Sequence, residues 1–322
     1  MPELPDLVVY IEALTQRAAG RRLDRLRIVR PFVLRTVDPP AVSLAGRRLS
    51  EVRRIGKRLV LGFEESGDNA ASPCRERELF AALHLMIAGR LRWRDKVAGA
   101  GGGERPPDAH TLDRTRPAMA SVQAAFEFED GTLYVTEAGS TRRASIQILR
   151  AADLGALDQG GVEPLDASLD AFRGALLRER HTLKRALTDP RLFSGIGRAY
   201  SDEILHAARL SPLKLTSALT HAEVAALREA TRATLALWIA RLRAQARGRF
   251  PEKVTAFRPE MAVHGRFGQA CPVCARPVQR IVYRDTECNY CAVCQTGGRL
   301  LADRALSRLL GEDWPGSLDD LP

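Results

Sequence analysis

Two closely spaced pairs of cysteines constrain the fold of this chain more than any other feature. Cys271 and Cys274 form one CxxC pair, and Cys291 and Cys294 form another after sixteen intervening residues. Four thiolates at this spacing suit tetrahedral Zn²⁺, and the residues between the pairs are expected to form a β-hairpin that brings them together. Because four protein ligands leave no open coordination position, we expect one structural zinc ion rather than a catalytic metal.

Cys288 leaves an alternative ligand set open, because it forms a further CxxC pair with Cys291. The wider spacing favours Cys291 and Cys294 as ligands, which makes Cys288 a spare thiol. Five of the six cysteines lie between Cys271 and Cys294, whereas a disulfide scaffold would spread them along the chain. Since the start of the chain also lacks a secretory signal, we expect a reducing, cytoplasmic location.

The charge of the chain indicates the kind of partner. The formal net charge is +10 and the sequence pI is about 9.8, which favours a polyanion, with nucleic acid preferred over a membrane surface. No apolar run approaches the roughly 20 residues that a membrane span needs. A hydrophobic content of 45% over 322 residues supports packed cores in two or three domains.

The first part of the chain has one helical pattern followed by many strand-like stretches. Apolar residues at helical spacing begin at Leu4, and Gly20 ends the pattern. Two of the strand-like stretches flank Asp130 and Gly131, a strong signal for a hairpin turn. We therefore predict that residues 1–150 form an α+β domain with a sandwich or barrel of strands.

Two polar stretches interrupt the strand pattern, and helices replace it after about residue 150. Residues 64–78 and 95–118 are rich in Gly, Pro and Ala and are predicted to be surface loops. The longest helix is predicted over residues 221–245, where Thr220 and Glu223 fit a capping box at its start. Its expected core face consists of Val224, Leu227, Leu235, Trp238 and Leu242.

A glycine turn before a helical pattern is a candidate phosphate site. Gly195 and Gly197 precede a helical stretch, where free backbone N–H groups and the helix dipole attract anions. Arg198 in the first turn favours a DNA phosphate as the ligand, although tight glycine turns between helices are usually structural. Arginines of the expected hairpin, Arg284 among them, suggest a further phosphate contact, with a solvated basic face as the alternative.

Taken in order, these features resemble the formamidopyrimidine-DNA glycosylase / endonuclease VIII family. The matching stretches are PELPD at the start, the Gly-Lys of RRIGKRLVLGFE, HLMIAGRL, SGIGRAYSDEILHAARLSP, VHGRFGQACPVC and the closing CAVCQ. The resemblance implies a β-sandwich domain with an amino-terminal helix over residues 1–150, a helix–two-turn–helix domain over 151–255 and a zinc finger over 256–298. Residues 299–322 form a tail without an assigned function. The implied activity is excision of damaged bases from DNA, followed by cleavage of the strand.

The resemblance also assigns roles to single residues. Once Met1 is removed, Pro2 would attack C1′ of the damaged nucleoside and form a Schiff base. A free α-amine has a pKa of about 7.7–8.0, and the helix dipole should lower it further. Glu3 would protonate the sugar ring oxygen, and Lys57 would contact the phosphate and assist catalysis. Further candidates are Asp6 as a catalytic residue and His84, Lys184, Gly195, Gly197, Arg198 and Arg284 as DNA contacts.

Each catalytic assignment has a structural alternative. Pro2 and Pro5 could simply mark the start of a helix, and Lys57 could be one of many surface lysines. The main alternative to an enzyme is a damaged-DNA-binding protein of the same architecture without lesion chemistry. A zinc-ribbon RNA-binding protein ranks lower, because the start motif would then have no use. In the leading interpretation, the protein is a nucleoid-associated monomer.

The sequence departs from the family pattern at several positions. Asp6 replaces a glutamate, Arg198 replaces a phosphate-binding asparagine, and Thr286 replaces an arginine of the zinc hairpin. Ile87 takes the place of the wedge methionine, and TEAGSTRRAS replaces an Arg-Phe pair after the strand hairpin. Since wedge residues fill the gap left by an everted base, the resemblance does not transfer lesion specificity.

Overall fold

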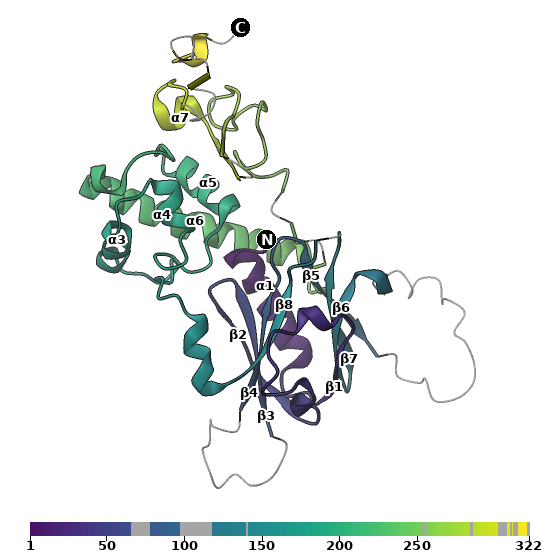
Figure 1. Cartoon of the computed structure of the whole chain (residues 1–322). Helices are drawn as coiled ribbons and strands as arrows, with labels where there is room; N and C mark the ends of the chain where they lie inside the picture. Colours follow the sequence, from purple (N-terminus) through teal and green to yellow (C-terminus); the bar gives the residue numbers. More distant parts are fainter. Residues whose placement is uncertain are drawn as a thin grey trace. The chain divides into compact units, whose positions relative to one another are not determined.

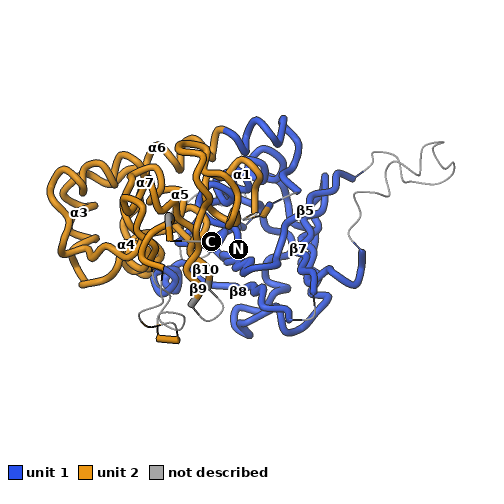
Figure 2. Tube along the Cα trace, turned by 90° about the horizontal axis from the view of Figure 1, so that it is seen from above, with its two compact units in different colours: residues 1–158, 241–254 blue, residues 159–240, 255–322 orange. Residues whose placement is uncertain are grey.

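The computed structural model divides the chain into two compact units (Figure 2). Unit 1 comprises residues 1–158 and 241–254, and unit 2 comprises residues 159–240 and 255–322. The finer division at residues 150, 255 and 298 stays a prediction. The structure describes residues 1–65, 78–96, 118–139, 141–252, 254–255, 257–283, 286–301, 308–309, 311 and 315–320. Most of each predicted surface loop lies outside these residues, as does Cys74.

Unit 1 begins with helix α1 (Leu4–Ala18), as the apolar spacing predicts. Glu3 is the N-cap residue and Pro5 lies in the first turn, where a missing N–H breaks no helical hydrogen bond. Gly20 follows the helix with a left-handed φ of +74°, which a glycine adopts without strain.

Eight strands of unit 1 form two four-stranded antiparallel sheets (Figure 1). The first sheet has the order β1 (Leu23–Ile28), β6 (Val122–Phe128), β7 (Gly131–Glu137), β5 (Gly89–Asp95). The second has the order β2 (Arg48–Ile55), β3 (Arg58–Glu64), β4 (Leu79–His84), β8 (Ser145–Arg150). Short 3-10 helices connect them: η1 (Pro31–Val33), η2 (Ala41–Leu44), η5 (Met119–Ser121) and η6 (Ala151–Leu157).

The core of unit 1 lies between the two sheets. Alternate residues of the strands point inward, and Leu7, Tyr10 and Leu14 of α1 join the same apolar cluster. Strands β3 and β4 are apolar on both faces because Leu154 and Leu157 of η6 cover their outer side. The predicted β-sandwich with an amino-terminal helix is therefore confirmed.

The segment after residue 240 belongs to unit 1 because it packs against α1. The Phe250 ring lies 5.7 Å from the Tyr10 ring, centroid to centroid, and both residues are buried. Arg17 donates from Nη2 to the carbonyl oxygen of Gly248 at 2.8 Å, and Arg243 forms an ion pair with Glu12. The sequence pattern indicated a helix as far as residue 245 but no packing partner for this segment.

Unit 2 is helical up to its cysteine-rich end (Figure 1). Its helices are α3 (Leu169–Leu177), α4 (Leu183–Thr188), α5 (Arg198–Ala207), the 3-10 helix η7 (Thr216–Ala218) and α6 (His221–Ala246), which continues into unit 1. Both bonds of the predicted capping box are present, since Thr220 N–H donates to Glu223 Oε2 at 2.9 Å and Glu223 N–H donates to Thr220 Oγ1 at 3.2 Å. The predicted core face of α6 is buried.

The cysteine-rich end contains the predicted hairpin and part of the tail. Strands β9 (Gln279–Tyr283) and β10 (Thr286–Tyr290) pair antiparallel, and α7 (Ala292–Thr296) follows. From the tail, Leu300, Leu301 and Leu318 pack against Tyr290, with Leu318 in the 3-10 helix η9 (Leu318–Asp320). The tail thus extends the small apolar core of the finger. The predicted α+β class is confirmed.

Among the described residues, no helix combines the length and the apolar character that crossing a membrane requires.

Gly131 permits close side-chain packing in the first sheet. It begins β7, after the turn that the sequence predicts, and a Cβ atom at this position would lie 2.4 Å from Cζ2 of Trp93. No real Cβ tolerates such a distance, so the indole ring or the strand would have to move. Trp93 is itself fixed, because its Nε1–H donates to Asp95 Oδ1 at 2.7 Å.

We expect Gly131→Ala to lower the free energy of unfolding by about 1–3 kcal/mol, as overpacking of a rigid core does. Gly155→Ala is the matched control, because no atom lies within 4 Å of its added Cβ. The control should stay within about 0.5 kcal/mol of the parent. Urea unfolding followed by circular dichroism measures both, and equal stabilities would contradict the close packing of Trp93.

Candidate active site and metal centre

Strand pairing brings Lys57 and His84 to the same end of the second sheet. Ile55 pairs with Arg58, and Arg58 pairs with His84, so the three residues form one row across β2, β3 and β4. The turn that joins β2 to β3 consists of Gly56 and Lys57 and lies just beyond this row, with Gly56 at a φ of +59°. Both predicted residues therefore belong to one edge of the sandwich.

The turn from β4 to β5 starts from the same row. Met86 has a left-handed φ of +51°, and Ile87 beside it is 67% exposed. Arg90 Nη1 donates to the carbonyl oxygens of Ile87 at 2.9 Å and Gly89 at 2.6 Å, which ties the turn to the start of β5. The turn therefore presents an apolar side chain, Ile87, at its tip.

The first turn of α1 buries two carboxylates. The backbone N–H of Glu3 donates to Asp6 Oδ2 at 3.0 Å, and the two residues are only 4% and 2% exposed. Asp6 thus caps the helix and holds the backbone of Glu3 in place. The structure gives Asp6 a positioning contact, while the catalytic role assigned to it stays a prediction.

The surroundings of the Met1 amine lower its pKa. Burial is the largest cause, and the positive charges of Arg90 and Lys57 act in the same direction, against Glu3 and Asp6. These electrostatic interactions show that the start of the chain lies near the turn that carries Lys57. A lowered pKa increases the unprotonated fraction of the Met1 amine at neutral pH.

Glu137 supports this end of the sandwich and was not among the predicted residues. Its buried carboxylate accepts hydrogen bonds from the backbone N–H of Arg143 at 2.9 Å and of Ala144 at 3.0 Å. Glu137 pairs with Gly89, so the loop that it closes starts beside the β4–β5 turn. In the sequence, Glu137 is a single acidic residue before an Ala-Gly-Ser stretch, and this pattern alone does not identify it as a buried hydrogen-bond acceptor.

In unit 2, the predicted glycine turn leads directly into α5. Gly195 has a left-handed φ of +81°, Gly197 is the N-cap residue, and the Arg198 side chain is exposed. The turn therefore presents the amino end of a helix next to an exposed guanidinium. This geometry suits an anion.

Lys184 lies beneath this turn and uses its three N–H groups within the protein. Nζ donates to the carbonyl oxygen of Arg198 at 2.7 Å, to Ser201 Oγ at 2.8 Å and to Asp202 Oδ1 at 2.6 Å. An ammonium group has three donors, and all three have acceptors here. Lys184 therefore holds the start of α5, and its predicted contact with DNA stays untested.

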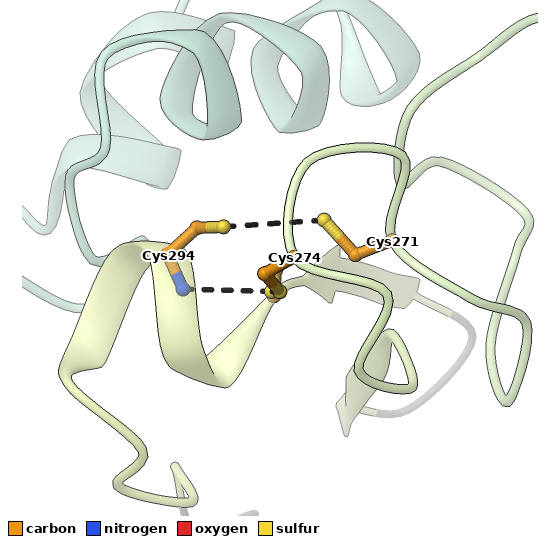
Figure 3. A group of neighbouring side chains, drawn as sticks. Cys271, Cys274 and Cys294 are labelled. Carbon is orange, nitrogen blue, oxygen red and sulfur yellow. Dashed lines mark hydrogen bonds between the residues drawn. The ribbon is translucent and has the colours of Figure 1, made fainter.

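The four predicted cysteines converge at one point. The Sγ atoms of Cys271, Cys274, Cys291 and Cys294 all lie within 4.8 Å of one another. The loop before β9 supplies Cys271 and Cys274 (Figure 3). Cys291 is the N-cap residue of α7, and Cys294 lies within that helix. A tetrahedral Zn²⁺ with ~2.3 Å bonds requires sulfurs about 3.8 Å apart. The distances of 3.3 Å for Cys274–Cys291 and 4.0 Å for Cys271–Cys294 bracket that value.

The thiols of this centre have shifted pKa values. Burial raises the pKa of Cys271 and Cys274, but hydrogen bonds from neighbouring backbone N–H groups outweigh it, so both are lowered. Burial raises the pKa of Cys291 to about 11 and that of Cys294 further. The four thiols interact directly with one another, since Cys271 Sγ contacts Cys294 Sγ and Cys274 Sγ contacts Cys291 Sγ.

Cys288 lies outside the four-cysteine cluster. Its Sγ donates to Asp202 Oδ1 at 3.1 Å, and burial, followed by the charge of Asp202, raises its pKa well above the usual range. Its sulfur is hydrogen-bonded to that carboxylate and is not one of the four clustered Sγ atoms. The geometry therefore favours the ligand set with Cys291 and Cys294 over the pair with Cys288.

Helix α5 attaches the finger through buried polar side chains that the sequence did not reveal. The Glu203 carboxylate accepts hydrogen bonds from the backbone N–H groups of residues 262–264 at 2.7–3.0 Å. His264 Nδ1 lies 2.8 Å from Asp202 Oδ2, and His206 Nε2 lies 3.3 Å from Cys271 Sγ. A polar run in a helix usually faces solvent, so only the fold could identify this face.

The hairpin arginines are only partly described. The Arg280 guanidinium lies 4.2 Å from the centroid of the Phe267 ring and forms an ion pair with Glu287 at 3.6 Å. Arg284, a predicted DNA contact, lies outside the described residues.

His84 provides a direct test of the electrostatics at the sandwich end. Burial, aided by the charges of Arg58 and Lys57, lowers its pKa from 6.5 to about 4. The unfolded chain binds this proton near pH 6.5, so the stability that neutral His84 contributes is complete above pH 6.5. It is lost as the pH falls towards 4. We expect an NMR titration midpoint near 4, with the signal assigned by its loss in His84→Gln. A midpoint near the ordinary value would contradict this environment.

Comparison with known proteins follows both units. Residues 1–138 match the model of the formamidopyrimidine-DNA glycosylase N-terminal domain, and residues 161–247 match that of the formamidopyrimidine-DNA glycosylase H2TH domain. The chain is 30% identical over 289 residues to a formamidopyrimidine-DNA glycosylase of Moorella thermoacetica, covering 87% of this chain and 94% of the relative. It is 40% identical over 151 residues to an uncharacterized formamidopyrimidine-DNA glycosylase-like protein of Mycobacterium tuberculosis, covering 47% and 93%.

Solved structures show the same fold. The MutM (Fpg) protein of Thermus thermophilus superimposes with a TM-score of 0.66 at 27% identity, over 91% of this chain and 98% of that one. Lactococcus lactis Fpg in complex with DNA containing an abasic site gives 0.70 at 21% identity, over 91% and 99%. With its sandwich, helix–two-turn–helix unit and four-cysteine cluster, the chain belongs to the formamidopyrimidine-DNA glycosylase family.

Proposed function

We propose that the protein is a base-excision-repair DNA glycosylase and abasic-site lyase. It removes damaged, oxidised bases through a Schiff base on Pro2 and then cleaves the strand by elimination. The observation that carries this proposal is the start of α1, where Pro2 and Glu3 are buried and Asp6 holds the backbone of Glu3. Relatives named formamidopyrimidine-DNA glycosylase support the same activity.

Pro2 is the proposed nucleophile once Met1 has been removed. Its secondary amine attacks C1′ of the damaged nucleoside, and the base departs with its bonding electrons and takes up the proton that the amine loses. The sugar ring then opens to a cationic iminium. Glu3 protonates the ring oxygen O4′ as that bond breaks. The iminium acidifies the C2′ hydrogens, so loss of one proton expels the 3′ phosphate and cuts the strand.

The remaining residues bind and position the DNA. Lys57 contacts the phosphate beside the reacting sugar, and neutral His84 donates or accepts a hydrogen bond at the same edge. Asp6 keeps Glu3 in place through the helix cap. In unit 2, the turn before α5 and exposed Arg198 bind a further phosphate, with Lys184 holding the turn from below.

The four-cysteine centre holds one structural Zn²⁺ in this proposal. The sulfur distances fit tetrahedral coordination, and four thiolates leave no position for substrate. When bound, the metal would cross-link the loop before the hairpin to α7, and it would take no part in the reaction. The protein acts as a cytoplasmic, nucleoid-associated monomer on damaged or abasic duplex DNA.

A DNA-binding protein without lesion chemistry is the alternative. It is favoured by the β4–β5 turn, where Ile87 replaces a methionine, and by the loop after Glu137, which lacks the Arg-Phe pair of the family. In the family pattern, residues of these two segments fill the gap left by an everted base, so their replacement weakens the case for base excision.

Borohydride trapping on DNA with an abasic site tests the nucleophile without requiring lesion recognition. The mature protein should form a covalent adduct, because reduction fixes the iminium between Pro2 and C1′. One residue added ahead of Pro2 should abolish the adduct, since the attacking nitrogen becomes an amide. Intact mass spectrometry verifies which residue starts the chain.

Matched variants separate the roles within the first turn of α1. Pro2→Gly should lower trapping at least tenfold, whereas Pro5→Ala, in the same turn, should keep it, because Pro5 provides no nucleophile. Glu3→Gln should slow base release far more than cleavage at a preformed abasic site. Absence of any adduct from the mature protein across pH 6–8 would establish the DNA-binding alternative instead.

Metal analysis tests the centre independently of catalysis. Native mass spectrometry should show one Zn²⁺ per chain, and Cys271→Ser should lose it, because a three-thiolate site binds zinc much more weakly. Cys288→Ser is the matched control and should keep the full metal content, since its sulfur points to Asp202. Loss of zinc from the control would identify the other CxxC pair as the ligand set.

A further inference from the structure

Helix α5 carries a buried histidine that points at a cysteine of the metal centre. His206 is 6% exposed and lies in the last turn of α5, and its Nε2 is 3.3 Å from Cys271 Sγ. The two residues are 65 positions apart in the chain. The contact therefore results from the packing of α5 against the finger and not from the local geometry of a cysteine knuckle.

The other donors near these sulfurs are backbone groups of the knuckles themselves. The N–H of Val273 is 3.5 Å from Cys271 Sγ, and the N–H of Cys294 is 3.5 Å from Cys291 Sγ. His206 adds a side-chain donor to Cys271 at a shorter distance. Cys271 is also almost fully buried, so water cannot easily replace that donor.

We propose that His206 is a positioning residue of the metal centre, whose Nε2–H donates a hydrogen bond to the Cys271 thiolate. This inference rests on the metal-binding part of the proposed function. Four thiolates and one Zn²⁺ carry a net charge of about −2, and N–H donors to sulfur are what offsets such charge in a buried site. A thiolate accepts hydrogen bonds, so the histidine must present N–H at Nε2.

The hydrogen bond has two consequences. It withdraws electron density from one sulfur, which makes Cys271 less nucleophilic and the centre slower to lose its metal. It also fixes the last turn of α5 to the first knuckle, while the first turn of the same helix follows the glycine turn proposed to bind phosphate. Helix α5 then fixes the distance between the metal centre and the proposed phosphate site, because each lies at one end of it.

Two substitutions isolate the donor. His206→Phe keeps a flat ring and removes the hydrogen bond, whereas His206→Gln keeps an N–H in about the place of Nε2. We expect His206→Phe to weaken zinc affinity about 10–100-fold in competition with a chromophoric chelator, and His206→Gln to recover most of the loss. Gln295→Leu is the matched control: it removes bonds to Cys291 N and the Leu210 carbonyl, but no donor to Cys271.

Alkylation distinguishes a donor from a residue that merely packs. Cys271 Sγ displaces iodide from iodoacetamide and forms a sulfur–carbon bond, and peptide mass spectrometry reports the rate at each cysteine. Relative to the wild type, we expect His206→Phe to accelerate alkylation of Cys271 severalfold more than alkylation of the other three ligands. Equal acceleration at all four, or wild-type rates in a folded His206→Phe, would overturn the proposal. Failure of the wild type to bind zinc would overturn the metal centre itself.

A measurement on the unaltered protein covers the case in which the variants do not fold. With ¹¹³Cd in place of zinc, a hydrogen bond to a metal-bound sulfur transmits a scalar coupling between the donor proton and the metal. We expect a cross-peak from the His206 Nε2 proton to ¹¹³Cd. Its absence, in spectra that show the corresponding peaks from backbone donors, would refute the hydrogen bond while leaving metal binding intact.

Discussion

A fully buried carboxylate is the constraint on which unit 2 depends. Asp202 is 1% exposed, so its charge must be compensated by the protein. Lys184 at 2.6 Å, His264 at 2.8 Å and Cys288 at 3.1 Å do this, and they come from α4, the segment that precedes Cys271, and β10. Burial raises the pKa of Asp202, but the charge of Lys184 and the bond to His264 outweigh it, so the pKa is lowered. One buried charge thus requires three segments to be in place together.

In unit 2, a buried carboxylate keeps its charge, whereas in unit 1 burial favours the uncharged form of two nitrogen groups. At the end of its sandwich, burial and neighbouring cations lower the pKa of both the Met1 amine and His84. The positive charge at this end of the sandwich is carried instead by Lys57, Arg58 and Arg90. The proposed reaction requires this separation of roles, because cations attract the phosphate backbone while an uncharged nitrogen attacks the sugar.

Helix α5 connects the two functional features of unit 2. Its first turn follows the glycine turn, and its buried side chains reach the finger at three points through Asp202, Glu203 and His206. Lys184 shows how burial changes the interpretation of a basic residue. Its three donors are directed to Arg198, Ser201 and Asp202, so it supports the backbone of the glycine turn, the proposed phosphate site, from within the protein.

The sequence by itself determined what depends on local spacing. The two CxxC pairs, the helix from Leu4, the capping box at Thr220 and the turn at Gly131 all depend on residues within a few positions of one another. Only the tertiary structure decided that Cys288 points to a carboxylate, that Glu137 closes a loop beside the β4–β5 turn and that His206 meets Cys271. Isolated polar residues carry no periodic signal, and the two residues of a contact are 65 positions apart for His206 and Cys271 and 86 for Asp202 and Cys288. Desolvation makes such contacts obligatory only after the chain has packed, which is why local pattern could not reveal them.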